Sequence, residues 1–498
     1  MNTLLGTLAA IPQATALALF AMAILLYGAI AKPQSNLASI RAAALGLAIA
    51  GLWFLLDFGQ EAVAPIGGYT QDDLVRYAAL LICFAAAVSL LLGLPRQQSL
   101  QFEGFEYPVL TLLSVVGMLL MVSAHSWLGL YLGLELQSLA LYVLAAYRRE
   151  SAPASEAGLK YFLLGALSSG LLLYGISLLY GYTGVLSFTE AEAALAARVA
   201  EGEALPLGLT FGLIFVMAGL AFKISAVPFH MWTPDVYQGA PTPVTAFFAT
   251  APKVAAFILV ARVLLGPLAP LQAAWVQIVT LLALASMLWG ALAAIQQSNI
   301  KRLMAYSSIG HMGFALVGLA VGSEVASLTP DLAWTGLAAV LVYLTTYLVM
   351  NLGTFALILA MQRDGTMVEQ ITDLAGLWQH QPSRALALLV IMFSMAGIPP
   401  FIGFFGKALI FYVAAQSAEI LFVTLAVAGL LTSVISAFYY LRLVKIAMLD
   451  GSETPLDTAS DPIHRWVMAL STLFILALPL LGLLLWAATQ AANGFLGA

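Results

Sequence analysis

Charged side chains inside apolar segments are the residues of this sequence that could do chemistry. They are Glu135, Lys160, Lys223, Lys253 and Lys407, and the stretch around each is apolar enough to lie in a membrane. A charge at the bilayer centre costs about 2.5–3.5 kcal/mol on insertion scales, so such groups persist where they pair, meet water or act. Burial and neighbouring charges change the proton affinity of amines and carboxylates. This set therefore indicates proton transfer inside a membrane.

Glu135 and Lys223 are the first two candidates. Glu135 occupies the middle of its apolar segment, and we interpret it as a titrating member of a proton path. The alternative is a buried carboxylate tied to one structural cation. Lys223 lies shortly before Pro228, which lacks the N–H that a helix needs and clashes with the preceding turn. Carbonyls freed at such a break admit water or ions, so Lys223 is a proton-site candidate; the alternative is that it only neutralises Glu135.

Two further lysines also stand beside helix breakers. Lys253 directly follows Pro252 in the middle of its segment. Lys407 comes after Pro399 and Pro400, which interrupt a second helix. We predict that Lys407 is a proton-transfer group rather than a packing residue, because an interrupted helix lets water reach it.

Three other groups leave two interpretations open. Lys160 lies only a few residues inside its segment, so its long side chain could equally reach the membrane interface. His311 lies in mid-segment, where an imidazole can both give and take a proton near neutrality; a structural, hydrogen-bonded histidine is an equal alternative. For His230, which follows the Pro228 break, the structural interpretation is preferred.

The composition indicates which elements must position these groups. Of the 498 residues, 62% are hydrophobic and only 9% are charged, whereas soluble domains carry about 25% charged residues. A soluble enzyme, a nucleic-acid binder and a disordered protein are therefore excluded. The apolar runs are continuous over about 20 residues rather than alternating, which excludes a porin-type barrel. The sequence thus predicts an all-α polytopic membrane protein.

No cofactor or metal site is expected in the chain. Cys83 is the single cysteine, whereas an iron–sulfur cluster needs about four protein ligands. One cysteine also cannot form an internal disulfide. The five histidines are scattered and have no metal-ligand spacing.

Fourteen membrane spans are predicted, joined by mostly short loops within a single transmembrane domain. The longest connection, between Gly184 and Pro206, contains a stretch at 189–198 that predicts a small amphipathic surface helix. The predicted spans are 12–31, 38–56, 75–94, 107–124, 127–147, 157–182, 206–226, 242–265, 272–295, 302–322, 332–360, 384–413, 420–443 and 466–489.

The distribution of basic residues predicts the orientation. Twelve lysines and arginines flank one side of the predicted spans, and three flank the other. Because positive charge accumulates on the cytoplasmic side, both termini are expected on the outer, periplasmic side. The twelve are Lys32, Arg41, Arg96, Arg148, Arg149, Lys301, Arg302, Arg363, Arg384, Arg442, Lys445 and Arg465, and the three are Arg76, Arg198 and Arg262.

A weak internal repeat is also visible. Met217-Ala218-Gly219 precedes Lys223, and Met395-Ala396-Gly397 precedes Lys407, each leading into a proline-broken helix with a lysine. The fourth to eighth spans and the ninth to thirteenth would then be two five-helix copies, and an odd number of helices inverts the second copy. This divides the chain into 1–94, a first repeat at 107–265, a second repeat at 272–443 and a last helix at 466–489.

Two motifs resemble a known family. They are Ala221–Lys253, which contains Pro228-Phe229-His230-Met231-Trp232-Thr233-Pro234-Asp235 and Gly239-Ala240-Pro241-Thr242-Pro243-Val244, and the stretch Asn299–Ile309. Both resemble the antiporter-like subunits, which are the proton-pumping membrane subunits of respiratory NADH:quinone oxidoreductase (complex I) and their relatives in multisubunit sodium/proton antiporters. The resemblance covers nearly the whole chain. It implies fourteen helices with two inverted five-helix repeats, each with a discontinuous helix.

The resemblance also implies roles for individual residues. Glu135 and Lys223 would form a pair between the fifth and seventh spans. Lys253 would be the central link, His311 part of a water-linked central axis, and Lys407 the terminal proton site near the outside. Where Lys407 stands, one other subunit type of the family typically has glutamate.

Partners and location follow from the same resemblance. Flavin, iron–sulfur clusters and quinone are expected in partner subunits, with no redox centre in this chain. The expected partners are other membrane subunits of complex I, including the L- and M-type antiporter-like subunits and small membrane subunits. The expected location is a bacterial inner membrane, with a mitochondrial or photosynthetic counterpart left open.

The rival function is that of a subunit of a multisubunit monovalent cation/proton antiporter. Hard cations such as sodium prefer carboxylate and carbonyl oxygens. The predicted membrane interior holds four lysines and one carboxylate, which argues against sodium as the carried ion.

Overall fold

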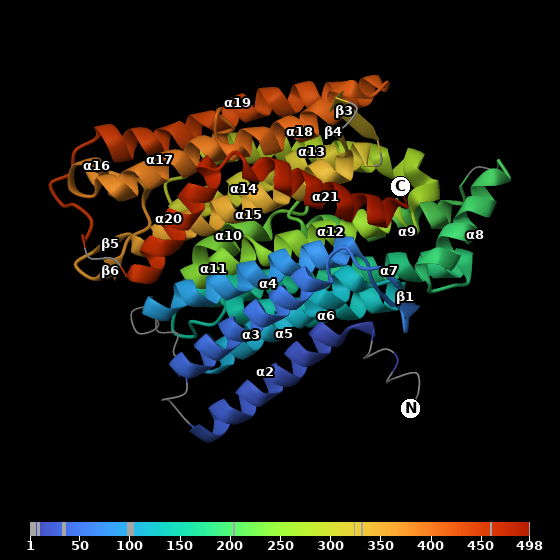
Figure 1. Cartoon of the computed structure of the whole chain (residues 1–498), viewed down its shortest axis with the longest axis horizontal. Helices are drawn as coiled ribbons and strands as arrows, with labels where there is room; N and C mark the ends of the chain where they lie inside the picture. Colours follow the sequence, from blue (N-terminus) through green and yellow to red (C-terminus); the bar gives the residue numbers. More distant parts are fainter. Residues whose placement is uncertain are drawn as a thin grey trace.

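Long apolar helices packed side by side make up most of the molecule (Figure 1). The structure, a computed structural model, describes residues 6, 10–31, 36–96, 104–202, 205–322, 324–329, 332–458 and 461–497. Each continuous apolar run folds as a helix because, in lipid, backbone N–H and C=O groups must bond within their own segment. The predicted all-α membrane fold is confirmed.

The first helices precede the two predicted repeats. They are α2 (Pro12–Ala31), α3 (Asn36–Asp57) and α4 (Asp73–Gly93), with the hairpin β1 (Val63–Ile66) and β2 (Tyr69–Gln71) before α4 and the turn η2 (Leu94–Arg96) after it. The region of the first repeat holds α5 (Glu106–Ser123), α6 (Trp127–Ala145), α7 (Ala152–Thr183), α8 (Phe188–Ala200), α9 (Leu207–Lys223), α10 (Trp232–Gly239), α11 (Thr242–Phe248) and α12 (Ala251–Leu265), followed by η3 (Ala269–Leu271).

The second half of the chain follows the same helical pattern with two more hairpins. Its helices are α13 (Gln272–Ile295), α14 (Ile300–Val321), α15 (Gly336–Ala360), η4 (Ile371–Leu374), α16 (Leu377–His380), α17 (Pro382–Ala396), α18 (Ile402–Gln416), α19 (Ile420–Leu449), α20 (Pro462–Leu476) and α21 (Leu480–Leu496). The hairpins are β3 (Val325–Thr329) with β4 (Leu332–Thr335), and β5 (Gln362–Arg363) with β6 (Thr366–Met367).

The number of membrane crossings stays a prediction. In the described part of the chain, eleven helices are long and apolar enough to cross a membrane, or twelve if a bent pair counts as one span. Three further apolar helices, α9, α17 and α18, are shorter than the 20 or so residues that a crossing needs. The amphipathic helix predicted at 189–198 is present as α8.

The centre of the bundle is formed by α11 with α12, by α14 and by α15. Nearly every residue in the apolar stretches of these helices is buried, whereas more than half of α2, α3 and α19 is uncovered. The central helices contain Lys253 and His311, so these two candidate groups lie in the interior of the bundle.

Glycines allow two helix pairs to pack unusually closely. A Cβ atom on Gly117 of α5 would lie 2.4 Å from the backbone nitrogen of Gln137 on α6. In the second half, a Cβ on Gly290 of α13 would lie 2.5 Å from the nitrogen of Gly310 on α14. Small residues at such contacts are typical of membrane helix pairs. The two pairs, α5 with α6 and α13 with α14, open the two predicted repeats.

The helix containing Lys223 is interrupted where the sequence predicted a break. α9 ends at Lys223, and residues 224–231 are non-helical before α10 begins. The predicted span at 206–226 therefore covers only the first half of a broken helix. The span at 242–265 is also interrupted, at Ala249 and Thr250. The second predicted break separates α17 from α18 around Pro399 and Pro400.

The last predicted span differs most from the structure. A single helix was expected at 466–489, but α20 and α21 are bent by 85° at residues 477–479. Pro479 explains the interruption, because it cannot donate to the helical ladder.

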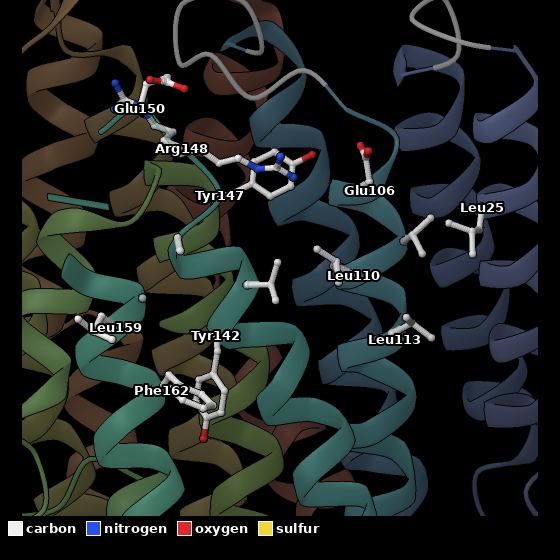
Figure 2. Close-up of a pocket in the computed structure, with 15 residues that line it drawn as sticks. Leu25, Glu106, Leu110, Leu113, Tyr142, Tyr147, Arg148, Glu150, Leu159 and Phe162 are labelled. Carbon is white, nitrogen blue, oxygen red and sulfur yellow. The ribbon is translucent and has the colours of Figure 1, made fainter. Parts of the chain in front are cut away.

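Two open grooves run along the lateral surface. One, of about 1160 Å³, lies between α2, α5, α6 and α7, and Figure 2 shows Glu106, Arg148 and Glu150 at one end of it and apolar side chains such as Leu113 below. The other, of about 1080 Å³, lies between α17 and α20.

Candidate functional site

Lys223 ends the first half of a broken helix and reaches across to α6. Its Nζ donates to Ser138 Oγ at 2.7 Å, and Ser138 in turn donates to the carbonyl of Leu134 at 2.5 Å. The aromatic ring of Tyr142 lies 5.9 Å from the same Nζ. The side chain is buried, and a hydroxyl and a ring face contact its ammonium group.

Glu135 lies one turn from Ser138 on α6 and is half-buried. Its Oε1 accepts a short hydrogen bond from Ser169 of α7, whose hydroxyl also lies 3.2 Å from Tyr131 Oη. Among the ion pairs of the described residues there is none between Glu135 and Lys223. Lys223 of α9 and Glu135 of α6 thus lie near the same stretch of α6. Ser138 contacts the lysine, and Ser169 contacts the carboxylate.

Lys253 places its ammonium at the end of α9. Its Nζ donates to the carbonyl of Ile224 at 3.3 Å and makes a short hydrogen bond to Ser225 Oγ. The ring of Trp232 lies 5.3 Å away and adds a cation–π contact. Carbonyls at a helix C-terminus carry partial negative charge, so they favour a cation at this position.

Lys407 makes the matching contact in the second half of the chain. Its Nζ donates to the carbonyls of Met395 and Ala396 at 2.9 and 3.1 Å and to Ser433 Oγ at 2.9 Å. These three acceptors use all three donors of the ammonium. The ring of Phe314 lies 4.9 Å from Nζ. The acceptors include no carboxylate, so carbonyl and hydroxyl dipoles and the face of the Phe314 ring stabilise the charge.

The two half-helices end in the same way. Ser225 and Gly397 both have left-handed backbone conformations, with φ of 61° and 83°. In each case the next N–H bonds back five residues, from Ala226 to the Ala221 carbonyl and from Ile398 to the Phe393 carbonyl, which is a Schellman-type helix end. A lysine from a later helix then covers the exposed carbonyls. The sequence could not reveal this likeness, because the lysines stand at different distances from the breaks.

His311 lies on α14 between two tyrosines. Its Nδ1 is 2.5 Å from Tyr343 Oη, and its Nε2 is 2.9 Å from Tyr440 Oη. Tyr440 continues to Ser307 Oγ at 2.5 Å. An imidazole with a hydroxyl at each nitrogen can accept a proton on one side and release one on the other. The interpretation as a relay is therefore compatible with the geometry, as is a purely hydrogen-bonded role.

Comparisons with known proteins place this arrangement in a family. Residues 124–436 match the family described as NADH:quinone oxidoreductase/Mrp antiporter, TM. The chain belongs to this family. NADH-quinone oxidoreductase subunit N 1 of Rhizobium meliloti is 49% identical over 99% of this chain and 98% of its own length. NADH-quinone oxidoreductase subunit N of Granulibacter bethesdensis is 52% identical over 82% of this chain and 81% of its own.

A solved structure agrees with the family assignment. A chain of respiratory complex I from Thermus thermophilus with bound aureothin is 35% identical, with a TM-score of 0.78. The alignment covers 96% of this chain and 99% of that chain. The resemblance inferred from the sequence motifs is therefore confirmed at the level of the family.

Lys160 is placed apart from the buried groups of this antiporter-family chain. Its side chain is 42% exposed and pairs with Glu156 at 2.7 Å and with Asp235 of α10 at 2.7 Å. Arg302 pairs with the other oxygen of Asp235 at 2.5 Å. Burial alone would raise the pKa of Asp235, but the hydrogen bonds from Lys160 and Arg302 outweigh it and lower that pKa. This geometry favours the interfacial interpretation of Lys160.

His230 and the prolines lie at the outside of the breaks. Pro228, Pro399 and Pro400 are exposed, and His230 is half-buried with its ring 6.2 Å from that of Trp289. The prolines thus interrupt the helices, and the hydrogen bonds of the buried ammonium groups go to other residues. His230 is not brought together with the lysines by any contact among the described residues.

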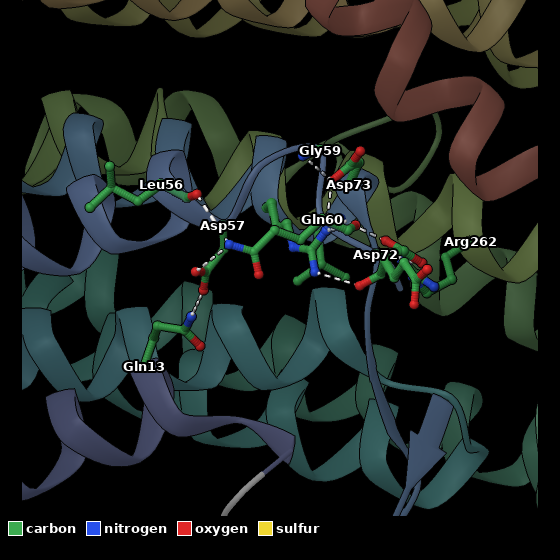
Figure 3. Close-up of polar contacts among 11 residues, drawn as sticks. Gln13, Leu56, Asp57, Gly59, Gln60, Asp72, Asp73 and Arg262 are labelled. Carbon is green, nitrogen blue, oxygen red and sulfur yellow. Dashed lines mark hydrogen bonds and ion pairs between the residues drawn. The ribbon is translucent and has the colours of Figure 1, made fainter. Parts of the chain in front are cut away.

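Two of the three basic residues assigned to the outer side are buried in ion pairs. Arg262 of α12 places one guanidinium nitrogen 2.8 Å from both oxygens of Asp72 (Figure 3). Arg76 pairs with Asp73 at 2.8 Å and donates to backbone carbonyls of the loop before α4. Arg198 on α8 is then the one of the three without an ion pair among the described residues.

The sequence missed the polar neutral side chains of the site. Each of them contacts a buried lysine, Glu135 or His311, and they are Ser138, Ser169, Ser225, Ser433, Tyr343 and Tyr440. A hydroxyl in an apolar helix is a weak signal, because it can satisfy itself on the carbonyl one turn back. Only the tertiary fold shows which hydroxyls face a charge.

Proposed function

We propose that the chain is the N-type proton-translocating membrane subunit of an NADH:quinone oxidoreductase. The observation that carries the proposal is the set of buried lysines, Lys223, Lys253 and Lys407, which face hydroxyls and carbonyls rather than carboxylates. An amine in a dry site without a counter-ion is a group whose protonation a small nearby change can switch. The 49% identity to a subunit N over nearly the full length supports the same assignment.

The proposed path follows the order of these groups through the bundle. Glu135 and Lys223 form one end, Lys253 lies at the first broken helix, His311 on the central helix α14, and Lys407 at the second broken helix. Each lysine can hold a proton at Nζ, and each neighbouring hydroxyl can pass one. Water would fill the gaps between these groups, because breaks in membrane helices allow water to enter.

The proposal assigns the redox chemistry to other subunits. Flavin, iron–sulfur clusters and quinone would be held there, and this chain would translocate protons as those subunits transfer electrons from NADH to quinone. Its neighbours would be L- and M-type antiporter-like subunits and small membrane subunits. It would lie in a bacterial inner membrane as a multi-pass protein with both termini on the periplasmic side.

The rival role in a cation/proton antiporter complex is less well supported. Sodium is best held by carboxylates and carbonyls together. Among the described residues, Glu135 supplies the carboxylate near the buried path, and its Oε1 already accepts a hydrogen bond from Ser169. The carbonyls at both breaks are covered by lysine ammonium groups, which would repel a second cation.

Purification of the chain with its native partners tests the proposal. We expect a tagged chain to co-purify with proteins that contain flavin and iron–sulfur clusters, and the preparation to oxidise NADH with quinone. Isolation with other antiporter subunits, without flavin or iron–sulfur clusters, would contradict the proposal and favour the rival.

A further inference from the structure

The groove between α2, α5, α6 and α7 has a charged mouth and apolar walls. Glu106 is the first residue of α5, and Arg148, Arg149 and Glu150 belong to the loop between α6 and α7, so the mouth lies where these helices begin or end. Figure 2 shows Glu106, Arg148 and Glu150 at this end and apolar side chains such as Leu110 below them. A ligand that fills the groove therefore needs a charged end and an apolar body.

The mouth offers both signs of charge at once. Its lining includes two bases, Arg148 and Arg149, and two acids, Glu106 and Glu150. None of the four forms an ion pair with another residue that the structure describes. Because the four charges sum to zero, the mouth favours a ligand that carries one positive and one negative group over an anion or a cation.

Arg148 lacks an acceptor in the described part of the protein. Its side chain is half-buried, and its Nε is buried without a hydrogen-bond partner among the described residues. It also interacts electrostatically with Lys301, which carries the same charge and is paired with Glu369. A buried donor without an acceptor costs free energy. A phosphate at Arg148 would supply acceptors to the guanidinium group and an opposite charge.

The apolar part of the groove has the size and the opening that a lipid chain needs. From Glu106 to Leu113 on α5, a step of seven residues corresponds to about 10 Å along the helix. The volume of about 1160 Å³ exceeds the roughly 300–1,000 Å³ of sites for small molecules. Leu159 and Phe162 of α7 and Leu25 of α2 line the groove and are exposed. The groove is therefore open to lipid from the side.

We propose that this groove binds phosphatidylethanolamine, a zwitterionic phospholipid. The phosphate would lie at Arg148 and Arg149, the ammonium group at Glu106 and Glu150, and one acyl chain along the apolar walls. A primary ammonium donates charge-assisted hydrogen bonds to carboxylates, whereas the trimethylammonium group of phosphatidylcholine has no N–H to donate. This lipid site goes beyond the proposed proton translocation and does not depend on it.

Photo-crosslinking with lipids of different headgroups tests the proposal. The chain, purified with its native partners, would be placed in phosphatidylcholine nanodiscs that contain a trace of photoactivatable phosphatidylethanolamine, phosphatidylcholine or phosphatidylglycerol. Labelled peptides of α5 and α7 would be quantified for the parent, Glu106→Gln, Glu106→Asp, Arg148→Gln and Val143→Trp. Val143 lines the groove and is 53% exposed, so a larger side chain there obstructs the groove. Glu192→Gln, which removes an exposed carboxylate of α8 outside the groove, is the matched control.

In the parent, we expect phosphatidylethanolamine to label these peptides about three-fold more than phosphatidylcholine, a preference within the range of one exposed ion pair. Phosphatidylglycerol should label them no more than phosphatidylcholine. Glu106→Gln should bring the ratio of phosphatidylethanolamine to phosphatidylcholine close to one, and Glu106→Asp should keep most of it. Arg148→Gln and Val143→Trp should reduce labelling by all three lipids, and Glu192→Gln should change nothing.

Three results would overturn the proposal. One is equal labelling of the parent by phosphatidylethanolamine and phosphatidylcholine, or a preference that persists in Glu106→Gln. Another is strongest labelling by phosphatidylglycerol, because the mouth would then select net negative charge. The third is crosslinking of these peptides to a neighbouring subunit in place of lipid, because a protein would then occupy the groove.

Discussion

Buried lysines without carboxylate partners are the central chemical feature at the level of single residues. Lys253 and Lys407 each use backbone carbonyls at the end of a half-helix, and Lys223 uses Ser138. The dipoles of such acceptors hold the ammonium group. These acceptors can reorient, or water can replace them, without another charged group having to leave. This distinguishes the site from a structural salt bridge, whose members stay charged as a pair.

Removal of the Glu135 carboxylate tests the first end of the path. Glu135→Gln keeps the size of the side chain and a possible hydrogen bond to Ser169 but removes the negative charge near Lys223. We expect proton pumping to fall several-fold, while electron transfer from NADH to an artificial acceptor in other subunits persists. Both would be measured in membrane vesicles. A Glu135→Gln complex that assembles and pumps at the parental ratio of protons to electrons would contradict this role.

The ion-pair network of Lys160, Asp235 and Arg302 predicts a pH-dependent stability. The pKa of Asp235 is lowered in the folded protein, so its pairing stabilises the fold above the ordinary pKa of about 4 and is lost as the pH falls through the folded value. Asp235→Asn should therefore lower the unfolding temperature of the purified complex at pH 7, and this difference should shrink only as the pH falls below about 4. Glu192→Gln, on the exposed face of α8, is the control. A difference that shrinks already between pH 7 and about pH 5, or one that stays constant below about pH 4, would rule out the linkage.

Close helix pairs fix the geometry at the level of elements. The α13–α14 pair meets at Gly290 and Gly310, and α14 contains His311 directly after this contact. A shift of α14 would move the imidazole away from Tyr343 and Tyr440. The glycine contacts are therefore expected to serve both assembly and the relay.

Substitution at this contact gives the prediction for the elements. In Gly290→Ala the new Cβ would lie 2.5 Å from a backbone nitrogen, so the two helices must separate. Overpacking of this kind costs about 1–3 kcal/mol, and we expect a lower unfolding temperature and less assembled complex. Gly170→Ala is the matched control, because a Cβ at Gly170 meets nothing within 4 Å. Equal yields and unfolding temperatures for the two variants would contradict the close contact.

Most of the helices and helix breaks could be predicted from the sequence, and the ones that were missed have physical reasons. Apolar length predicts a span, and proline predicts a break, as at Pro228 and Pro399. Pro252 was identified as a helix breaker, but the span at 242–265 was predicted as continuous, and the sharp bend before Pro479 was not predicted. A proline in a membrane helix can be tolerated without redirecting the helix, so the sequence alone does not distinguish the two cases. The charged members of the site were predictable from the cost of burying them, whereas their hydroxyl partners depend on which helices meet.

The orientation of the whole molecule is predicted from its basic residues. Ion pairs occur on both sides: Arg76 and Arg262 pair with acids on the proposed outer side, and Lys301, Arg302, Arg363 and Lys445 do so on the other. Because the rule counts lysines and arginines rather than net charge, the bias of twelve to three still predicts an outer location of both termini.

Reporter fusions test this orientation. A periplasm-dependent reporter joined to the C-terminus should be active, and the same reporter inserted after Arg149, in the loop between α6 and α7, should be inactive. A cytoplasm-dependent reporter should give the reverse pattern. Activity of the cytoplasmic reporter at the C-terminus would show that the orientation is inverted.

Proton pumping by variants of Lys407 is the most direct test of the proton-transfer account. Lys407→Arg keeps a positive charge beside Met395 and Ala396 but cannot release its proton, because guanidinium stays protonated in proteins. Lys407→Glu introduces the residue of another subunit type, and Lys407→Met keeps only the length. Pumping would be measured in vesicles and normalised to assembled complex.

The account predicts that Lys407→Arg and Lys407→Met pump several-fold less than the parent and that Lys407→Glu retains part of the activity. A packing role predicts the opposite order, with arginine and methionine tolerated better than glutamate. If Lys407→Arg pumps as well as the parent, Lys407 is a fixed charge and the proton-transfer account of this site is wrong.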